Sequence, residues 1–390
     1  MKQETISLLF GVHMHQPIDN FKEAIDHAVE ACYAPFFETM RKFPDFHFSV
    51  HCSGWLLETI KRNYPKLFAN MQWLTENGSI EFFTAGFYEP ILSAIPSKNR
   101  ISQIKKLNRT IKSTFDQTPK GLWLTERVWE SGLITDLVQT GIKYSVIDDY
   151  HFIASGFDRD RLDGYYNAEE NAETIALFPI SQSLRYALPF KPVDEAIEAI
   201  KESVKSPDGA AIIFDDAEKF GMWPKTHHWV YEQGWLEAFV KGILKDSSIK
   251  TMHYEYYLHS HRAKGVAYLP NVSYYEMGEW SLKADDALLL EGLREKILNK
   301  EAMKFLKGGI WKNFFIKYEE SNRLHKRMLE LSKVKTKRSS YLENLYALQT
   351  NDVFWHGIFG GLYLPNLRDN AYRFLINCEN IRYAKKKGCD

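Results

Sequence analysis

The sequence has little of what disulfide-rich, nucleic-acid-binding or membrane-spanning proteins need. It contains four cysteines (Cys32, Cys52, Cys378 and Cys389) without a C-x-x-C pair, which argues against a disulfide framework or a zinc ribbon. Lys and Arg together number 50, as do Asp and Glu, so no basic excess is present to bind nucleic acid. The apolar run near the start, residues 6–12, is far shorter than the ~20 residues of a membrane span, and no secretory signal precedes it. We therefore expect a cytoplasmic protein without nucleic-acid or membrane partners.

Aromatic residues, by contrast, are abundant, at 14% of the chain. Aromatic side chains fill cores, and they also stack on flat apolar ligand faces such as sugar rings. Their positions in the chain have to distinguish the two roles. Half of the ten tryptophans lie in or beside the polar segments described below: Trp123, Trp129, Trp223, Trp280 and Trp355. Trp223 lies in a loop-like stretch shortly after Asp216, which favours a stacking platform, although simple packing stays open.

Short β-branched or aromatic runs alternate with helical stretches in the first half of the chain. The predicted strands are residues 6–13, 47–52, 80–85, 121–125, 144–148, 174–180 and 210–215. Strands that alternate with helices form parallel sheets, and near-continuous apolar strands are buried on both faces. Seven such units favour an α/β barrel over a short open sheet. An eighth apolar run, 266–269, either closes the barrel or lies outside it.

After Trp280 the periodicity is helical throughout. Apolar stripes recur at the three- and four-residue spacing of a helix face, at Ala287, Leu290, Leu293 and Ile297, at Leu324, Met328 and Leu331, and at Ala371, Phe374, Cys378 and Ile381. These stripes predict a helical bundle packed on the barrel. We therefore expect a barrel domain over residues 1–280 and a helical domain over residues 281–390 that completes the active-site cleft.

Polar and reactive side chains gather where the predicted strands end. In parallel α/β barrels, catalytic groups lie at the carboxyl ends of the strands. A single polar residue there is often a helix cap, but six strand ends carry such residues, in segments 13–17, 51, 86–90, 125–129, 148–151 and 215–219. The sequence therefore predicts an active site on one rim of the barrel.

Two of these segments contain carboxylates suited to glycoside hydrolysis. Glu126 has Arg127 beside it, and a nearby guanidinium favours the ionised carboxylate that a nucleophile needs, unless the two form a structural pair. Asp215 and Asp216 alternate along a strand, so one can face the barrel mouth while the other supports a loop, unless they cap the next helix. One ionised and one protonated carboxyl on the same rim constitute the machinery of glycoside hydrolysis.

The histidines leave two interpretations open besides a buried structural role. His13 and His15, one residue apart after the first strand, resemble the start of a metal site, as in amidohydrolases and metal-dependent deacetylases. Next to a Gln-Pro pair, the same histidines can instead hydrogen-bond substrate hydroxyls. A fuller metal site would require His51 and His151 both to point inward, so we expect no metal.

Five short segments, in order along the chain, resemble the conserved regions of glycoside hydrolase family 57. They are residues 13–17 (HMHQP), 86–90 (GFYEP), 123–129 (WLTERVW), 215–221 (DDAEKFG) and 273–280 (SYYEMGEW). Two later segments, 308–315 (GGIWKNFF) and 351–357 (NDVFWHG), resemble the branch with archaeal-type 4-α-glucanotransferases and related α-amylases. The resemblance extends nearly end to end, but the large C-terminal β-sandwich domain of those glucanotransferases is not expected within these residues.

The resemblance implies a (β/α)7 barrel, a distorted TIM-like fold, followed by a C-terminal helical bundle. It implies that Glu126 is the nucleophile and Asp216 the general acid/base. It also implies that eight residues line or support sugar sites: His13, His15, Glu89, Trp123, Glu218, Trp223, Asp352 and Trp355. An α-1,4-glucan or maltooligosaccharide is the expected partner, no cofactor is expected, and a homodimer stays open.

We therefore expect a retaining enzyme that forms a covalent glucosyl-enzyme, with carboxyl groups about 5–5.5 Å apart. If a sugar hydroxyl outcompetes water, the enzyme is a 4-α-glucanotransferase, which aromatic platforms such as Trp223 and Trp355 favour. If water is the acceptor instead, the enzyme is an α-amylase. Two alternatives come from other classes: a metal-dependent deacetylase or hydrolase built on His13, His15 and an Asp, and a non-catalytic glucan-binding protein.

Overall fold

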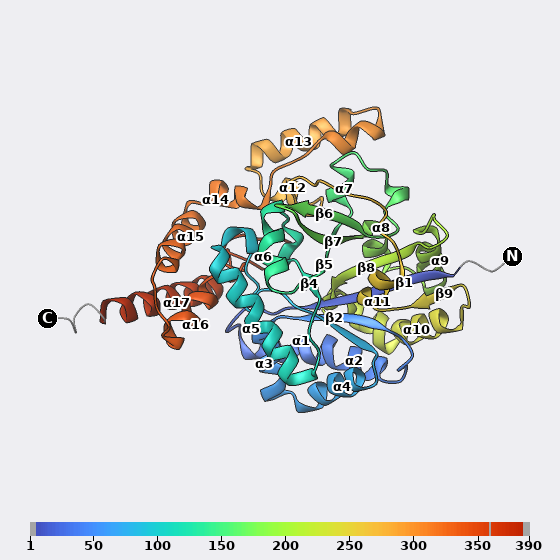
Figure 1. The fold of residues 1–390 in the computed structure, drawn as a ribbon, viewed down its shortest axis with the longest axis horizontal. Helices are drawn as coiled ribbons and strands as arrows, with labels where there is room; N and C mark the ends of the chain where they lie inside the picture. The colour runs from blue at the N-terminus through green and yellow to red at the C-terminus, as the bar shows by residue number, and fades with distance from the viewer. Residues whose placement is uncertain (1–4, 359, 385–390) are drawn as a thin grey trace.

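Seven parallel strands form the wall of a barrel in the computed structural model, which describes residues 5–358 and 360–384 (Figure 1). The strands are β1 (Ile6–Met14), β2 (Phe48–Cys52), β3 (Ile80–Phe83), β4 (Gly121–Trp123), β5 (Tyr144–Asp148), β7 (Glu173–Ile180) and β8 (Ala210–Asp216). They coincide with the strands predicted from the sequence to within a few residues. The seven-stranded barrel is therefore confirmed.

The hydrogen bonds between strands define the order of the wall. β3, β2, β1 and β8 pair in parallel, and so do β4, β5 and β7. A parallel bridge between Thr84 and Leu122 joins the two sheets after β3. On the opposite side, the Ser181 N–H donates to Ile212 O (2.9 Å) between the end of β7 and the middle of β8. The barrel is thus closed there through a loop residue rather than through a ladder.

Two strands lie outside the predicted set. β9 (Ile249–Thr251) pairs in parallel with the first part of β1, and β6 (Tyr166–Glu170) forms an antiparallel hairpin with β7. The apolar run 266–269 lies outside the barrel, because Val266 bridges to Asn167 in β6. The pattern missed β9 because it has three residues, and it missed β6 because this strand is polar and partly exposed.

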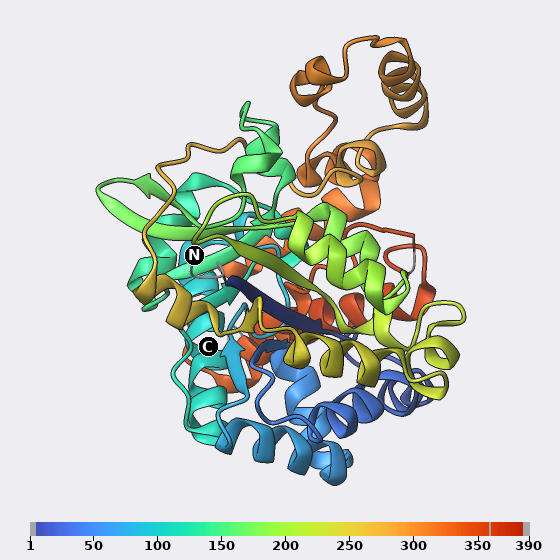
Figure 2. The ribbon, with the colours of Figure 1, turned by 90° about the vertical axis from the view of Figure 1, so that its right-hand side faces the viewer.

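Helices surround the barrel wall (Figures 1 and 2). Ile104, Leu107 and Ile111 are buried on one face of α5, and the longer helices pack their apolar faces inward in the same way. The helices of this part are α1 (Lys22–Ala28), α2 (Ala34–Met40), α3 (Gly54–Asn63), α4 (Pro65–Glu76), α5 (Ser97–Phe115), α6 (Ile134–Gln139), α7 (Tyr150–Ile153), α8 (Gln182–Ala187), α9 (Val193–Glu202), α10 (Trp235–Lys245) and α11 (Tyr254–Ser260).

The rest of the described chain is helical, as expected. Its helices are α12 (Met277–Trp280), α13 (Ala284–Lys296), α14 (Phe314–Lys317), α15 (Glu319–Ser332), α16 (Ser339–Leu348) and α17 (Pro365–Ala384). Leu324, Met328 and Leu331 are buried on α15. The prediction that the apolar stripe on α13 packs against the barrel is wrong. This helix projects from the body, and Leu293 is 44% exposed (Figure 2). Leu290 is the buried residue of that helix.

The thiols Cys32, Cys52 and Cys378 are buried and free, whereas Cys389 lies outside the described residues. None of the helices within residues 5–358 and 360–384 combines the length and the apolarity that crossing a membrane requires.

Candidate active site

The carboxyl ends of the strands bring several of the predicted site residues to one rim of the barrel. His13, at the end of β1, stacks on the indole of Trp123 from β4, with 4.3 Å between ring centroids and 15° between ring planes. His15 lies beside it, with ring centroids 6.1 Å apart. Ring stacking across the barrel fixes these side chains relative to one another. The floor of the site is therefore an aromatic layer rather than a set of mobile side chains.

Three residues of the rim have left-handed backbone conformations, which non-glycine residues rarely adopt. The φ angles are 51° at Glu89 and Glu126 and 49° at Arg127. Two of them are held by residues from much later in the chain. The backbone and side-chain N–H groups of Asn351 donate to Glu89 O at 3.0 and 2.8 Å, and the Ser273 hydroxyl donates to Glu126 O. The segments after the barrel therefore stabilise the strained turns that carry the carboxylates.

The charge of Asp216 affects the ionisation of Glu126, the other member of the predicted catalytic pair. Burial raises the pKa of Glu126 to about 7, and the charge of Asp216 acts in the same direction. Arg127 and the Tyr274 hydroxyl, which donates to Glu126 Oε2 at 2.8 Å, oppose this rise. The expected effect of Arg127 is therefore present but weaker than burial. Burial and the neighbouring Asp215 likewise raise the pKa of Asp216, so the pair retains a proton more readily than isolated carboxyls do.

Asp215 points into a buried cationic cluster. Its Oδ2 accepts a hydrogen bond from Lys219 Nζ, and Arg185 Nε lies 3.4 Å away. Although burial opposes it, the charges of Lys219 and Arg185 lower the pKa of Asp215 to about 2. Arg185 also donates to Asp148 Oδ2 at 2.9 Å, which ties the ends of β5 and β8 together. Asp215 therefore takes the supporting role expected for one of the two aspartates.

His15 and Asp352 form a partly buried ion pair between the barrel and the helical part. His15 Nε2 lies 3.1 Å from Asp352 Oδ1, and the Thr350 hydroxyl donates to Asp352 Oδ2 at 2.6 Å. Burial lowers the pKa of His15, but Asp352 outweighs this and raises it to about 9. Glu218 accepts hydrogen bonds from the His15 N–H (3.3 Å) and from the Tyr33 hydroxyl. Burial raises the pKa of Glu218 to about 7.

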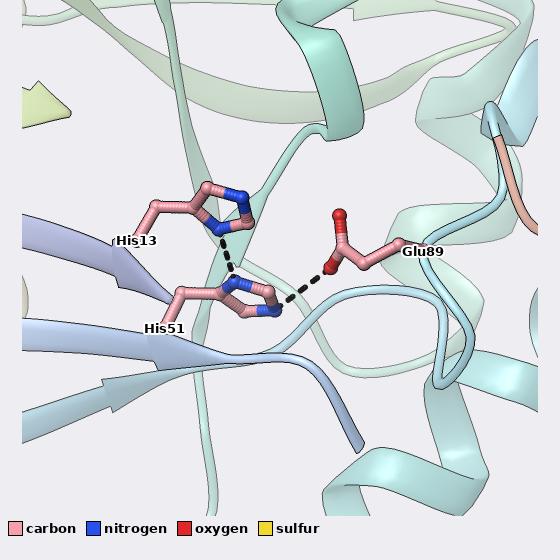
Figure 3. A group of neighbouring side chains, drawn as sticks. All are labelled: His13, His51 and Glu89. Atoms are coloured by element: carbon pink, nitrogen blue, oxygen red, sulfur yellow. Dashed lines mark hydrogen bonds and ion pairs between the residues drawn. The ribbon is translucent and has the colours of Figure 1, made fainter. Parts of the chain in front are cut away.

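One group of possible metal ligands, His13, His51 and Glu89, lies close together among the described residues (Figure 3). His51 Nδ1 lies 2.8 Å from His13 Nδ1, and its Nε2 lies 3.2 Å from Glu89 Oε1. The further ligand considered from the sequence, His151, is turned elsewhere. Its two nitrogens face backbone oxygens, at 2.9 Å from Asp148 O and Arg127 O.

The two tryptophans expected as acceptor platforms differ in their surroundings. Trp355 is 9% exposed, and its indole N–H donates to Asn351 Oδ1 at 2.7 Å, so it supports the wall and offers little open face. Trp223 is partly buried, with its ring 5.7 Å from that of Phe190 and Lys219 Nζ 5.4 Å from its centroid. It lies beside the cluster of Asp215.

Several residues with clear contacts to this site were not singled out from the sequence. Tyr274 and Asn351 lie within segments that resemble family motifs, so a closer examination of those segments could have found them. Tyr33 and Arg185 carry no such signal, because their partners lie far away in the sequence. Thr125 lies within the segment 123–129, and its hydroxyl donates to Glu89 Oε2 at 3.0 Å.

Two family models match parts of this chain. The model of glycosyl hydrolase family 57 matches residues 9–270, and that of the alpha-amylase/4-alpha-glucanotransferase middle domain matches residues 309–382. The chain is 42% identical over 383 residues to an alpha-amylase of Pyrococcus furiosus and 43% identical over 388 residues to a 4-alpha-glucanotransferase of Thermococcus litoralis. These alignments cover 97% and 98% of this chain, but 59% and 58% of the relatives.

A crystal structure of 4-alpha-glucanotransferase from Thermococcus litoralis has the same fold. Its TM-score with this chain is 0.93 at 42% sequence identity, and the match covers 96% of this chain and 60% of that one. The chain thus spans about three fifths of the length of the relatives that it matches.

Proposed function

The chain belongs to glycosyl hydrolase family 57, and on that basis we propose that it is a retaining enzyme acting on α-1,4-glucans, as a 4-α-glucanotransferase. Glu126 is the nucleophile and Asp216 the general acid/base. One observation carries this assignment: the two carboxyls, from the ends of β4 and β8, interact so that the charge of Asp216 raises the pKa of Glu126. A retaining glycosidase uses one ionised and one protonated carboxyl of this kind.

The proposed reaction has two displacements at the anomeric carbon. In the first, Glu126 attacks this carbon, the glycosidic C–O bond breaks, and Asp216 gives its proton to the leaving oxygen. In the second, Asp216 takes the proton of an incoming hydroxyl, whose oxygen displaces Glu126. The hydrogen bond from Tyr274 to Glu126 Oε2 (2.8 Å) favours the ionised form that attacks. The carboxyls accomplish these steps without a cofactor.

The remaining polar residues of the rim are proposed to hold the sugar. The cationic His15 and its partner Asp352 offer a donor and an acceptor to hydroxyl groups, as does Glu218 beside them. His13, stacked on Trp123, lies at the floor of the same space. These groups come from β1, β4, the turn after β8 and the helical part, so the sugar site needs both parts of the chain.

Transfer and hydrolysis differ in the acceptor, and we propose transfer. Trp223 supports this choice as a partly exposed aromatic residue near Asp215, and a structural relative named 4-alpha-glucanotransferase supports it too. The alternative α-amylase activity is supported by relatives that carry that name. The products distinguish the two activities, because transfer makes longer and shorter chains together, whereas hydrolysis makes shorter ones.

The test is incubation of the full chain with maltotriose, followed by chromatography of the products. We expect a ladder of longer and shorter maltooligosaccharides, and at least a ~1,000-fold lower rate in Glu126→Gln. Glu130→Gln is the matched control, because Glu130 pairs with Lys312 (2.6 Å) outside the carboxylate pair. Near-normal turnover by Glu126→Gln would contradict the assignment. Binding of maltotriose without turnover would instead indicate a glucan-binding protein.

We further propose that the chain divides at residue 280 and acts in the cytoplasm. The division is supported by the change to helices alone from α12 onward. The cellular location is supported by the three free buried thiols, since reducing compartments keep cysteines unpaired.

A further inference from the structure

The buried hydroxyl of Tyr33 contacts the proposed sugar site from an irregular turn of helix. Tyr33 is fully buried and is the last residue of a π-helix, Val29–Tyr33, which lies between α1 and α2. Its hydroxyl donates to Glu218 Oε1, and the His15 N–H donates to the same oxygen at 3.3 Å. Gln16 Nε2 in turn donates to the Tyr33 hydroxyl at 3.0 Å. Two donors on one oxygen thus fix the Glu218 carboxylate relative to His15.

The π-helix also has backbone carbonyls whose partners come from a distant loop. Pro35 has no N–H, so it cannot donate to Ala31 O four residues earlier as in an α-helix. Ala31 O instead lies 2.7 Å from His227 Nδ1, and Cys32 O accepts the Tyr231 hydroxyl at 3.0 Å. Such π-helical turns are frequent at functional sites. The missing N–H of Pro35 therefore leaves an acceptor for a side chain from outside the helix.

The donors to these two carbonyls flank the loop that carries Trp223. Gly221 lies at the start of this loop, and a Cβ atom there would lie 2.0 Å from Ala31 O. A residue without a Cβ atom is needed for the loop backbone to approach so closely. Because His227 and Tyr231 follow Trp223, the loop contacts the π-helix on both sides of that residue. The position of the indole thus depends on the π-helix.

We propose that the π-helix Val29–Tyr33 orients both sides of the sugar site and so determines which acceptor the enzyme uses. Tyr33 is the positioning residue for Glu218, and the two carbonyls hold the loop with Trp223 as the acceptor platform. A loosely held platform binds an acceptor sugar less well, whereas water needs no platform, so loosening the loop favours hydrolysis. This inference rests on the proposed function, because it takes the groups beside Glu218 and Trp223 to be glucan units.

The first test is Tyr33→Phe, which retains the buried ring and removes the hydroxyl. We expect KM for maltotriose to rise about tenfold with little change in kcat, because Glu218 contacts the sugar both before and during the reaction. The matched control is Tyr257→Phe, a buried tyrosine whose hydroxyl donates to Asp208 O at 2.9 Å near the start of β8. The KM of this control should stay unchanged.

A double-mutant cycle separates positioning from packing. In the Glu218→Ala background, Tyr33→Phe should change KM by less than about twofold, because the carboxylate that the hydroxyl orients is gone. An unchanged KM in Tyr33→Phe, or an equal effect of this substitution with and without Glu218, would overturn the positioning role. A lower unfolding temperature without a change in KM would show that the hydroxyl contributes to packing alone.

The second test is Tyr231→Phe, which removes the hydrogen bond to Cys32 O. We expect the ratio of lengthened to hydrolysed products of maltotriose to fall about fivefold, while the total rate of bond cleavage stays within about twofold. Hydrogen–deuterium exchange in residues 221–231 should accelerate by a similar factor, because the loop opens more often. An unchanged product ratio or an unchanged exchange rate would refute the role of the π-helix in acceptor choice.

Failure of this inference and failure of the proposed function give different results. A wild-type chain that turns over no glucan would refute the proposed function, and the sugar contacts inferred here with it. A wild-type chain that makes the ladder of products, while Tyr33→Phe and Tyr231→Phe behave like Tyr257→Phe, would refute this inference alone.

Discussion

Replacing Tyr274 with Phe should move the pH dependence of catalysis without dismantling the site. The hydroxyl of Tyr274 donates to Glu126 Oε2 at 2.8 Å, and a donor to the ionised form lowers the pKa of a carboxyl. Phe retains the buried ring, which contacts Trp280 edge to face at 5.9 Å and lies under Arg127 at 4.4 Å. The variant therefore removes one hydrogen bond and little else.

The size of the effect follows from that single bond. A hydrogen bond to a charged group contributes about 1.5–3 kcal/mol, and a shift of one pKa unit corresponds to about 1.4 kcal/mol. In Tyr274→Phe the pKa of Glu126, about 7 in the wild-type chain, should therefore rise by about one to two units. Because the ionised carboxylate attacks, activity is lost as the pH falls through this pKa, so the acidic limb moves to higher pH.

The assay is kcat/KM for maltotriose from pH 5 to 10. The matched control is Tyr275→Phe, which removes a neighbouring hydroxyl that has no hydrogen bond to Glu126. We expect its acidic limb to stay with that of the wild-type chain. An acidic limb of Tyr274→Phe that does not move, or that moves to lower pH, would refute the reasoning.

Three further changes test other contacts. Asp352→Asn should lower the pKa of His15 from about 9 and shift the alkaline limb of kcat/KM down by about two units; an unmoved limb would exclude His15 as its source. Asn351→Ala loses two buried hydrogen bonds and should cost about 2–4 kcal/mol, seen as a lower unfolding temperature, and an unchanged temperature would contradict this. Lys219→Met should destabilise the chain by about 3 kcal/mol at pH 7. Because the pKa of Asp215 is depressed to about 2, this difference should shrink as the pH falls below about 4. A difference in stability between Lys219→Met and the wild-type chain that persists at pH 2 would argue against the ion pair with Asp215 as its cause.

The barrel and its rim could be predicted because they rest on local patterns. Apolar strands alternate with helices through β8, and the polar residues that end the strands come directly after them in the sequence. The stripe on α13 shows the limit of this reasoning. Its spacing is helical and a helix forms, but Leu293 is 44% exposed because periodicity does not say what a helix packs against. The strands β9 and β6 were missed because β9 has three residues and β6 is polar and partly exposed.

The sequence by itself determined which residues stand at the strand ends, and so placed Glu126 and Asp216 on one rim. The tertiary structure decided how those residues are charged and held. Burial, rather than the adjacent Arg127, dominates the pKa of Glu126. The strained turn of Glu89 is held by Asn351, more than 200 residues further along the chain. Ionisation and backbone strain depend on desolvation and on partners distant in sequence, which local spacing does not specify.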